Sequence, residues 1–179
     1  MRLAFVSLIA SIALASCAAF AQQPLPVETI RIDTAAGPKD FRVEIAADHS
    51  SQERGLMFRR AMDADAGMLF DLHQSEQIAF WMKNTELPLD MLFIRADGTV
   101  SSIEPNAIPY STDPIPSAEP VRAVLEINGG RAYALGIKPG DRVHATIFHN
   151  TDVADAETVV TSACSATAAN TQGACSARH

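Results

Sequence analysis

Alternation of apolar and polar residues is the main pattern in the middle of the chain, and it predicts β-strands. Residues 29–33 and 41–45 both alternate, as expected of strands with one buried and one exposed face. Gly37 and Pro38 lie between these two segments and favour a turn. The pattern therefore predicts a hairpin near the start of the domain.

A second hairpin is predicted around Asp97 and Gly98. This dipeptide readily takes the positive φ angles of a type I′ turn, and residues 89–96 and 99–104 flank it as strands. Residues 91–94 are apolar at every position, which is typical of an interior strand. Further strands are expected at residues 67–70, 78–82, 121–127 and 142–148.

Two short helices interrupt the strands. Ser50 and Glu53 have the spacing of a capping box before the apolar residues 56–58. Residues 131–135 favour a helix of one or two turns that ends at Gly136. Many strands, few helices and frequent turns predict a mainly β domain, a small β-sandwich or a jelly-roll-like barrel with two short helices.

Residues 1–21 have the three-part pattern of a secretory signal peptide. A positive charge at Arg2 is followed by the apolar residues 3–16 and by the small-residue site 19–21. The residues that end at Cys17 also resemble a lipobox, in which this cysteine becomes the lipidated first residue. The sequence therefore predicts an exported protein, periplasmic or secreted, and leaves open whether it is free or anchored to the envelope by lipid.

The mature protein is expected to be one domain with a tail. Residues 27–150 carry the strand and helix patterns, whereas residues 151–179 are rich in Ala, Ser and Thr and are expected to be disordered. Cys164 and Cys175 lie in this tail and would form a disulfide in an oxidising compartment. No segment of the mature form is long and apolar enough to predict a membrane span.

Charge and motif content exclude several classes of function. The formal net charge is -7, and no basic cluster is present, so nucleic-acid binding is not expected. Zinc motifs such as C-x-x-C and H-E-x-x-H are absent, as are dinucleotide and P-loop fingerprints, so we expect no metal and no cofactor. Five methionines between residues 57 and 91 are interpreted as core residues and not as copper ligands.

The densest set of functional groups surrounds the single tryptophan. Alternation places Trp81 and Lys83 on one face, and Asn84 and Asp90 follow before the next strand. Trp81 would stack on a ligand, Lys83 and Asn84 would donate hydrogen bonds, and Asp90 would accept them or orient Lys83. The alternative is that Trp81 belongs to the core and Lys83 ends a strand.

Acidic residues within strands provide the alternative of a hydrolase. Asp90 and Glu104 are the candidates for an acid–base pair acting on cell-wall or carbohydrate substrates, and Glu126 is a third acid in a strand. Linear spacing does not show that these carboxyl groups converge. Nucleophile motifs such as G-x-S-x-G are absent.

Several ordered strings carry a family resemblance. They are RGLMFR at 54–59, AGMLF at 66–70, FWMKNT at 80–85, PLD at 88–90, VLE at 124–126 and LGIKPGD at 135–141. Together they resemble the prokaryotic domain-of-unknown-function family 192, over a stretch from about Thr29 to Phe148. The resemblance implies a small, mainly β domain of sandwich or jelly-roll type, often exported, and it implies no established activity.

The sequence as a whole favours binding over catalysis. We expect a non-enzymatic envelope domain that binds a small molecule, a glycan or a partner protein through the groups around Trp81. A hydrolase and a purely structural or interaction domain are the two alternatives that the sequence leaves open.

Overall fold

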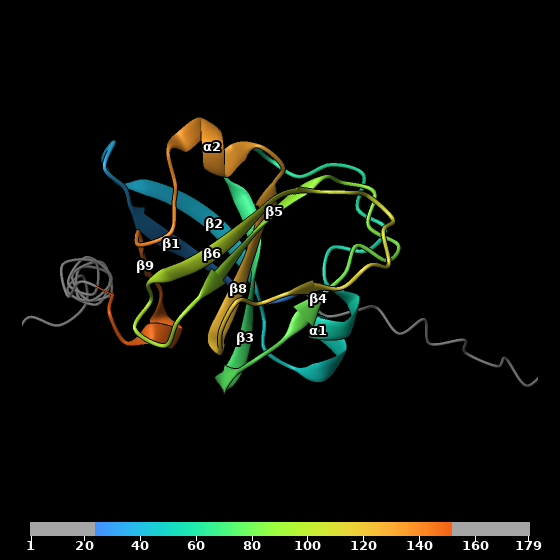
Figure 1. Cartoon of the computed structure of the whole chain (residues 1–179), viewed down its shortest axis with the longest axis horizontal. Coiled ribbons are helices and arrows are strands. Elements are labelled where there is room, and N and C mark those ends of the chain that lie inside the picture. The colour runs from blue at the N-terminus through green and yellow to red at the C-terminus, as the bar shows by residue number, and fades with distance from the viewer. Residues whose placement is uncertain (1–23, 152–179) are drawn as a thin grey trace, which may run out of the picture.

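The structure is a computed structural model that describes residues 24–151, and within this range it is mainly β (Figure 1). The strands are β1 (Val27–Asp33), β2 (Lys39–Ala46), β3 (Ala66–Glu76), β4 (Ala79–Phe80), β5 (Leu89–Ile94), β6 (Val100–Ala107), β7 (Ile115–Pro116), β8 (Val121–Asn128) and β9 (Arg142–His144). The helices are α1 (His49–Arg54) and α2 (Arg131–Leu135), with a 3-10 turn at Thr146–Phe148. The predicted mainly β fold with two short helices is confirmed.

Four predictions concern segments outside the described residues: the signal peptide, lipidation of Cys17, the disordered tail, and the disulfide between Cys164 and Cys175. Each stays a prediction. Of the helices in the described part of the chain, none has the length and apolar character that crossing a membrane requires.

Seven strands form one strongly curled sheet with the order β6-β5-β8-β3-β2-β1-β9 (Figure 1). Every neighbouring pair is antiparallel except β2 and β3, which are parallel. The two ends of the sheet meet, because Val143 donates its N–H to the Gly98 carbonyl at 2.8 Å and Val100 donates to Asp141 at 2.8 Å. This contact brings the sheet close to a closed barrel.

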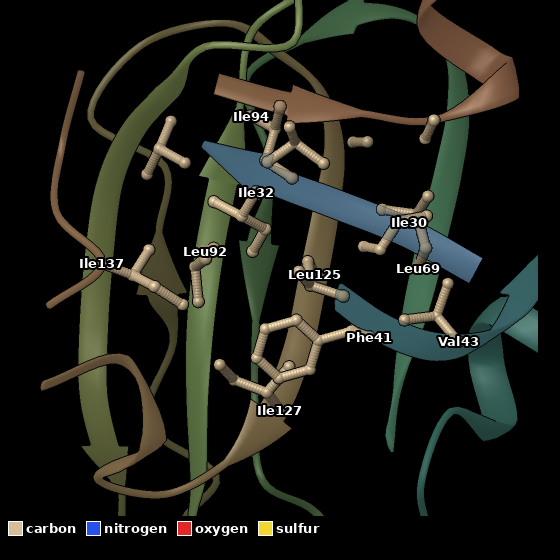
Figure 2. Close-up of a cluster of buried hydrophobic side chains, with 14 of the residues drawn as sticks. Ile30, Ile32, Phe41, Val43, Leu69, Leu92, Ile94, Leu125, Ile127 and Ile137 are labelled. Carbon is tan, nitrogen blue, oxygen red and sulfur yellow. The ribbon is translucent and has the colours of Figure 1, made fainter. Parts of the chain in front are cut away.

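The inner face of the curled sheet holds the larger hydrophobic core. Figure 2 shows its side chains converging from β1, β2, β3, β5 and β8. Its largest fully buried members are Ile30, Ile32, Phe41, Leu69, Leu92 and Ile94. Strand β5 lies between β6 and β8 and is buried along its whole length, which confirms the interior strand predicted from residues 91–94.

A second hydrophobic cluster covers the opposite face of the sheet, beneath α1 and β4. Its members include Met68, Met82 and Met91, each with no exposed surface. The rings of Phe70 and Phe80 meet edge to face with their centres 5.0 Å apart. This cluster forms the lower part of the candidate site described below.

The start of α1 differs from the prediction. Asp48 and Ser51 form the capping box, and not Ser50 and Glu53. Asp48 has an extended backbone, so its carboxylate reaches forward to accept the N–H groups of Ser50 and Ser51 at 3.0 and 3.1 Å. Ser50 is already helical and cannot take this role.

The turn between β5 and β6 also differs in type. A type I′ turn needs positive φ at two successive residues, but in this turn only Gly98 has one, at 86°. Gly98 donates to the Arg95 carbonyl at 3.0 Å, and the Asp97 carboxylate accepts the Thr99 N–H at 2.9 Å. The hairpin predicted here is confirmed, and its turn has three residues with glycine at the left-handed position.

Two predicted strands are shorter than expected. Only residues 79–80 of the predicted segment 78–82 pair as a strand, with the two-residue β7. Only residues 142–144 of the segment 142–148 pair, because β9 meets only the last three residues of β1. The chain after β4 is therefore free to form a loop, and this loop carries the tryptophan.

Candidate functional site

A groove of about 580 Å³ opens on the sheet face that carries the second cluster. One wall is the end of α1 with the turn that follows it, and the other is β4 with residues 81–85, which we call the rim loop. The apolar lining includes Leu56, Phe70, Leu72, Ile78 and Phe80. A groove of this size with apolar walls and few polar groups is typical of small-molecule sites.

Glu126 lies at the floor of the groove. Its strand, β8, is flanked by β3 and β5, and the residues in register with it there are Met68 and Met91. The side chain is only 5% exposed and has no hydrogen-bond or ion-pair partner among the described residues. Burial raises the pKa of this carboxyl to about 8, so most of it is protonated at neutral pH.

Trp81 and Lys83 stand together at the rim. The Lys83 ammonium lies 5.1 Å from the centre of the Trp81 ring, within the range of a cation–π contact. Trp81 is 51% exposed, whereas Met82 between them is fully buried. Alternation therefore placed the two side chains correctly, and the alternative that Trp81 belongs to the core is wrong.

The backbone of the rim loop is clamped by neighbouring loops on two sides. Phe58 donates its N–H to the Asn84 carbonyl at 2.9 Å, and Tyr110 donates to the Thr85 carbonyl at 3.1 Å. Phe58, Asn84 and Tyr110 all have positive φ, at 64°, 55° and 61°. This conformation is costly for Phe and Tyr and less so for Asn, and such positions cluster at functional sites.

Asn84 completes the set of predicted residues that the groove brings together. With Trp81 and Lys83 it lines the opening, and its side-chain nitrogen lies 3.8 Å from the Met57 sulfur across the groove. Thr85 also lines the groove and is 5% exposed. The amide therefore links the two walls.

Asp90 lies elsewhere. It has no exposed surface, and its two carboxylate oxygens accept the backbone N–H groups of Asn106, Gly130 and Ala132 at 2.8 to 2.9 Å. These contacts fix the turn that begins α2. Glu104 is exposed on β6, so the structure gives neither carboxyl a place in the groove.

Register explains why Asp90 and Glu126 do not share a site. Asp90 is opposite Ile127 on β8, and the next residue, Met91, is opposite Glu126. Because side chains alternate along a strand, Asp90 points to the inner face of the sheet and Glu126 to the groove face.

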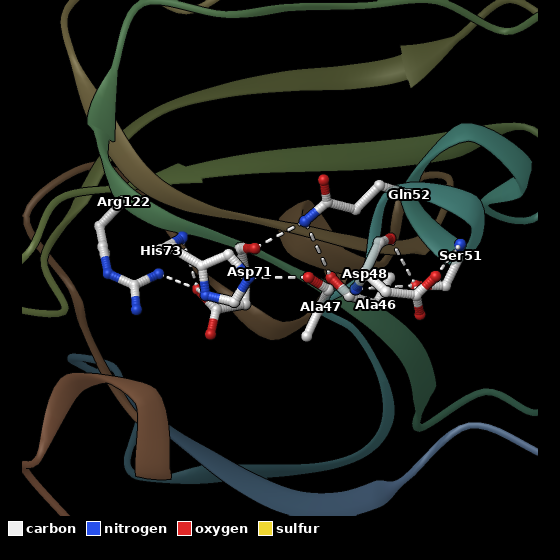
Figure 3. A network of polar contacts seen from close by, with 8 residues as sticks. All are labelled: Ala46, Ala47, Asp48, Ser51, Gln52, Asp71, His73 and Arg122. Atoms are coloured by element: carbon white, nitrogen blue, oxygen red, sulfur yellow. Dashed lines mark hydrogen bonds and ion pairs between the residues drawn. The ribbon is translucent and has the colours of Figure 1, made fainter.

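The α1 wall is held to the sheet by a polar network (Figure 3). Gln52 donates its side-chain amide to the carbonyls of Ala46 and Asp71, at 3.3 and 2.6 Å. Burial acts to raise the pKa of the Asp71 carboxyl, but hydrogen bonds from the Arg122 guanidinium and the His73 N–H hold it below its usual value. The network fixes the position of the helix against β2 and β3.

A smaller pocket adjoins the groove on the far side of α1. Glu44 and Arg59 form a two-pronged ion pair there, with N–O distances of 2.5 and 2.7 Å. The Arg59 contact holds the pKa of the Glu44 carboxyl below its usual value, although burial opposes it. The segment between α1 and β3, which carries Arg59, is thereby attached to β2.

In the sequence, Glu126 is one of several acids that lie in predicted strands. The signal that marks it is its position in residues 123–127, where the other four residues are apolar and alternate between both faces. An acid in such a segment has to be buried. Among residues 24–151, no group of three or more His, Cys, Asp or Glu side chains is placed to hold a metal ion.

Comparisons with known proteins identify a family and several similar solved structures. Residues 30–145 match the family model DUF192, described as "Uncharacterized ACR". A crystal structure from Sinorhizobium meliloti 1021, described as a candidate transcription regulator, is 48% identical with a TM-score of 0.69, covering 70% of this chain and 98% of that one. A protein of unknown function from Novosphingobium aromaticivorans DSM 12444 is 43% identical with a TM-score of 0.66, covering 68% and 86%. The comparison with curated proteins gave no match.

Proposed function

The chain belongs to the DUF192 family, and from this premise and the geometry of the groove we propose that the domain binds a small organic molecule. One observation carries the proposal. Glu126 is a buried carboxyl without a protein partner, and it lies beneath an opening to solvent. A ligand group in the groove would give this carboxyl the hydrogen-bond partner that the protein does not supply.

The shape of the ligand follows from the rim. Trp81 offers a large flat surface at the mouth of the groove, and the walls below it are apolar. Such a site favours a molecule with a flat apolar body that stacks on the indole and carries a polar group toward the floor. Lys83 and Asn84 contact the part of the ligand that remains near solvent.

A hydrolase and a purely structural domain, the two alternatives from the sequence, receive less support than ligand binding. A hydrolase needs two carboxyl groups that face one cleft, but Asp90 is enclosed by backbone donors on the inner face of the sheet. A purely structural role leaves the open groove and the strained rim loop without a reason. A transcription regulator that contacts DNA is not favoured by a net charge of -7.

The place of action is a second part of the proposal. The signal pattern of residues 1–21 supports binding outside the cytoplasm, in the periplasm or after secretion, either as a free domain or on a lipid anchor at Cys17. Mass spectrometry of the mature N-terminus tests this. A chain that begins at Gln22 or at a lipid-modified Cys17 supports export, whereas an intact Met1 on protein purified from whole cells contradicts it.

Binding is tested with 6-propionyl-2-(dimethylamino)naphthalene (Prodan), a flat, uncharged and environment-sensitive fluorophore. We expect a blue shift of its emission with the wild type, and an affinity about two- to tenfold lower with Trp81→Ala, since loss of stacking costs about 0.5–1.5 kcal/mol. Tyr133→Ala is the matched control, because Tyr133 is 91% exposed but does not line the groove. Absence of binding, or equal affinity in all three proteins, contradicts the proposal.

A further inference from the structure

We infer that Glu126 determines which ligands the groove accepts. As an uncharged acid it donates a hydrogen bond to an uncharged acceptor oxygen, such as a ketone, amide or ester carbonyl. Ionisation of Glu126 removes this donor and releases the ligand. The inference rests on the proposed function and names the chemical class of its ligand. It stands on the position of Glu126 at the floor, on its burial and on the absence of a protein partner among the described residues.

The neighbours of Glu126 in the sheet provide no counter-charge. A single row of register partners crosses five strands in the order Glu44, Met68, Glu126, Met91 and Glu104. Uncharged methionines therefore separate the central carboxyl from the two outer ones, which lie two strands away, at about 10 Å. The Glu44 carboxylate on β2 is neutralised by its ion pair with Arg59, and the Glu104 carboxylate on β6 is exposed to water.

The charged groups that line the groove do not pair with Glu126 either. Glu53 and Arg54 come from α1, and Lys83 comes from the rim loop. The Glu53 carboxylate lies 3.3 Å from the His49 ring, and the Lys83 ammonium lies over Trp81. Burial is accordingly the cause that raises the pKa of Glu126 to about 8, and no nearby cation opposes it.

This environment fixes the kind of hydrogen bond available at the floor. A protonated carboxyl has one O–H donor, and an ionised one has only acceptors. An uncharged carbonyl oxygen therefore matches the protonated form. A ligand carboxylate would have to lose its water without a cation at the floor, and a ligand ammonium would create a buried ion pair between methionines, with a desolvation cost that its attraction does not reliably repay.

The experiment compares Prodan with 2-(dimethylamino)naphthalene, which has the same ring system without the ketone. Affinities are measured by fluorescence titration at pH 6 and pH 9. With the wild type at pH 6 we expect Prodan to bind at least fivefold more tightly than the analogue. At pH 9 only about a tenth of Glu126 is protonated, so the Prodan affinity should fall about tenfold while the affinity of the analogue changes little.

Two substitutions separate the donor from the charge. Glu126→Gln keeps an N–H donor that does not titrate, so it should retain the preference for the ketone and lose the pH dependence. Glu126→Met has no donor, so it should bind both probes equally at both pH values. Circular dichroism at pH 6 and pH 9 shows that each protein is folded when its affinity is measured.

The outcomes distinguish this inference from the proposed function. If both probes bind and Trp81→Ala weakens both, but the ketone and the pH have no effect on the wild type, only the role of Glu126 is overturned. If neither probe binds, both the proposed binding function and the role of Glu126 are overturned. Tighter binding of 2-naphthylmethylammonium than of Prodan at pH 7 would also overturn the inference, since it would show that the floor prefers a cation.

Discussion

The Phe58 N–H donates a 2.9 Å hydrogen bond to the Asn84 carbonyl, and both residues have positive φ. The contact joins the turn after α1 to the rim loop at the mouth of the groove. Two non-glycine residues in a costly conformation on either side of one hydrogen bond mean that the surrounding packing holds this part of the backbone in place. The opening of the groove is therefore a preformed feature of the fold.

Substitution of Asn84 tests how much strain the rim loop carries. Alanine at φ 55° should lower the free energy of unfolding by about 1 kcal/mol. Asparagine tolerates the left-handed region because its short polar side chain forms local hydrogen bonds, and alanine has no such side chain. Glycine adopts this region freely, so Asn84→Gly should match or exceed the wild type in urea denaturation. Both variants lose the amide, so equal destabilisation would show that the amide and not the backbone matters.

Glu126 should make stability depend on pH in an unusual direction. Its pKa is raised from 4.5 to about 8 by folding, so between these values the folded state holds a proton that the unfolded state has released. The free energy of unfolding is therefore greatest below pH 4.5, as far as this residue contributes, and falls by about 1.4 kcal/mol per pH unit until about pH 8. Denaturant titrations from pH 5 to 9 measure this slope.

The matched variant for that measurement is Glu126→Gln, which has a similar size and does not titrate. Its stability should be close to that of the wild type at pH 5 and several kcal/mol higher at pH 8. Identical pH profiles for the two proteins would show that Glu126 is ionised in the folded state at neutral pH.

Asp90 is expected to be a structural residue. Asp90→Ala leaves three backbone N–H groups near α2 without their acceptor, so the free energy of unfolding should fall by about 3 kcal/mol or more. Glu104→Ala, on the exposed side of β6, should change it by less than about 0.5 kcal/mol. A stable, folded Asp90→Ala protein would contradict this role.

The ion pair between Asp71 and Arg122 predicts a loss of stability in acid. Folding lowers the pKa of Asp71, so its contribution is present above the unfolded pKa and is lost as the pH falls through the folded one. Arg122→Met should therefore cost about 2–3 kcal/mol at pH 7 and progressively less below pH 4. A cost that does not change with pH would attribute the loss to packing of the arginine side chain.

Sequence periodicity predicted β1 and β2 because each has a buried and an exposed face, and this is a local property. Residues 29–33 and 41–45 show the alternation, and both segments lie within observed strands. The ends of β4 and β9 could not be predicted, since they depend on how far the partner strand extends. The capping role of Asp48 depends on where α1 begins, which the S-x-x-E pattern misplaced.

The candidate site was predictable only in part for a similar reason. Trp81, Lys83 and Asn84 are close in sequence, so their proximity in space was expected. Asp90 was included because it follows them, but the alternation of β5 turns it to the other face. Glu126 reaches the groove through pairing of β8 with β3, a contact between distant segments that no local pattern contains.

The position of Glu126 has a consequence for how the domain folds. The floor of the groove belongs to a strand whose pairing with β3 joins Gly67 to Ile127, sixty residues apart. Closing so long a loop carries an entropy cost and is slow, so the pairing should form late on the folding pathway. A chain in which β8 has not yet joined the sheet therefore lacks the floor of the groove and cannot bind a ligand there.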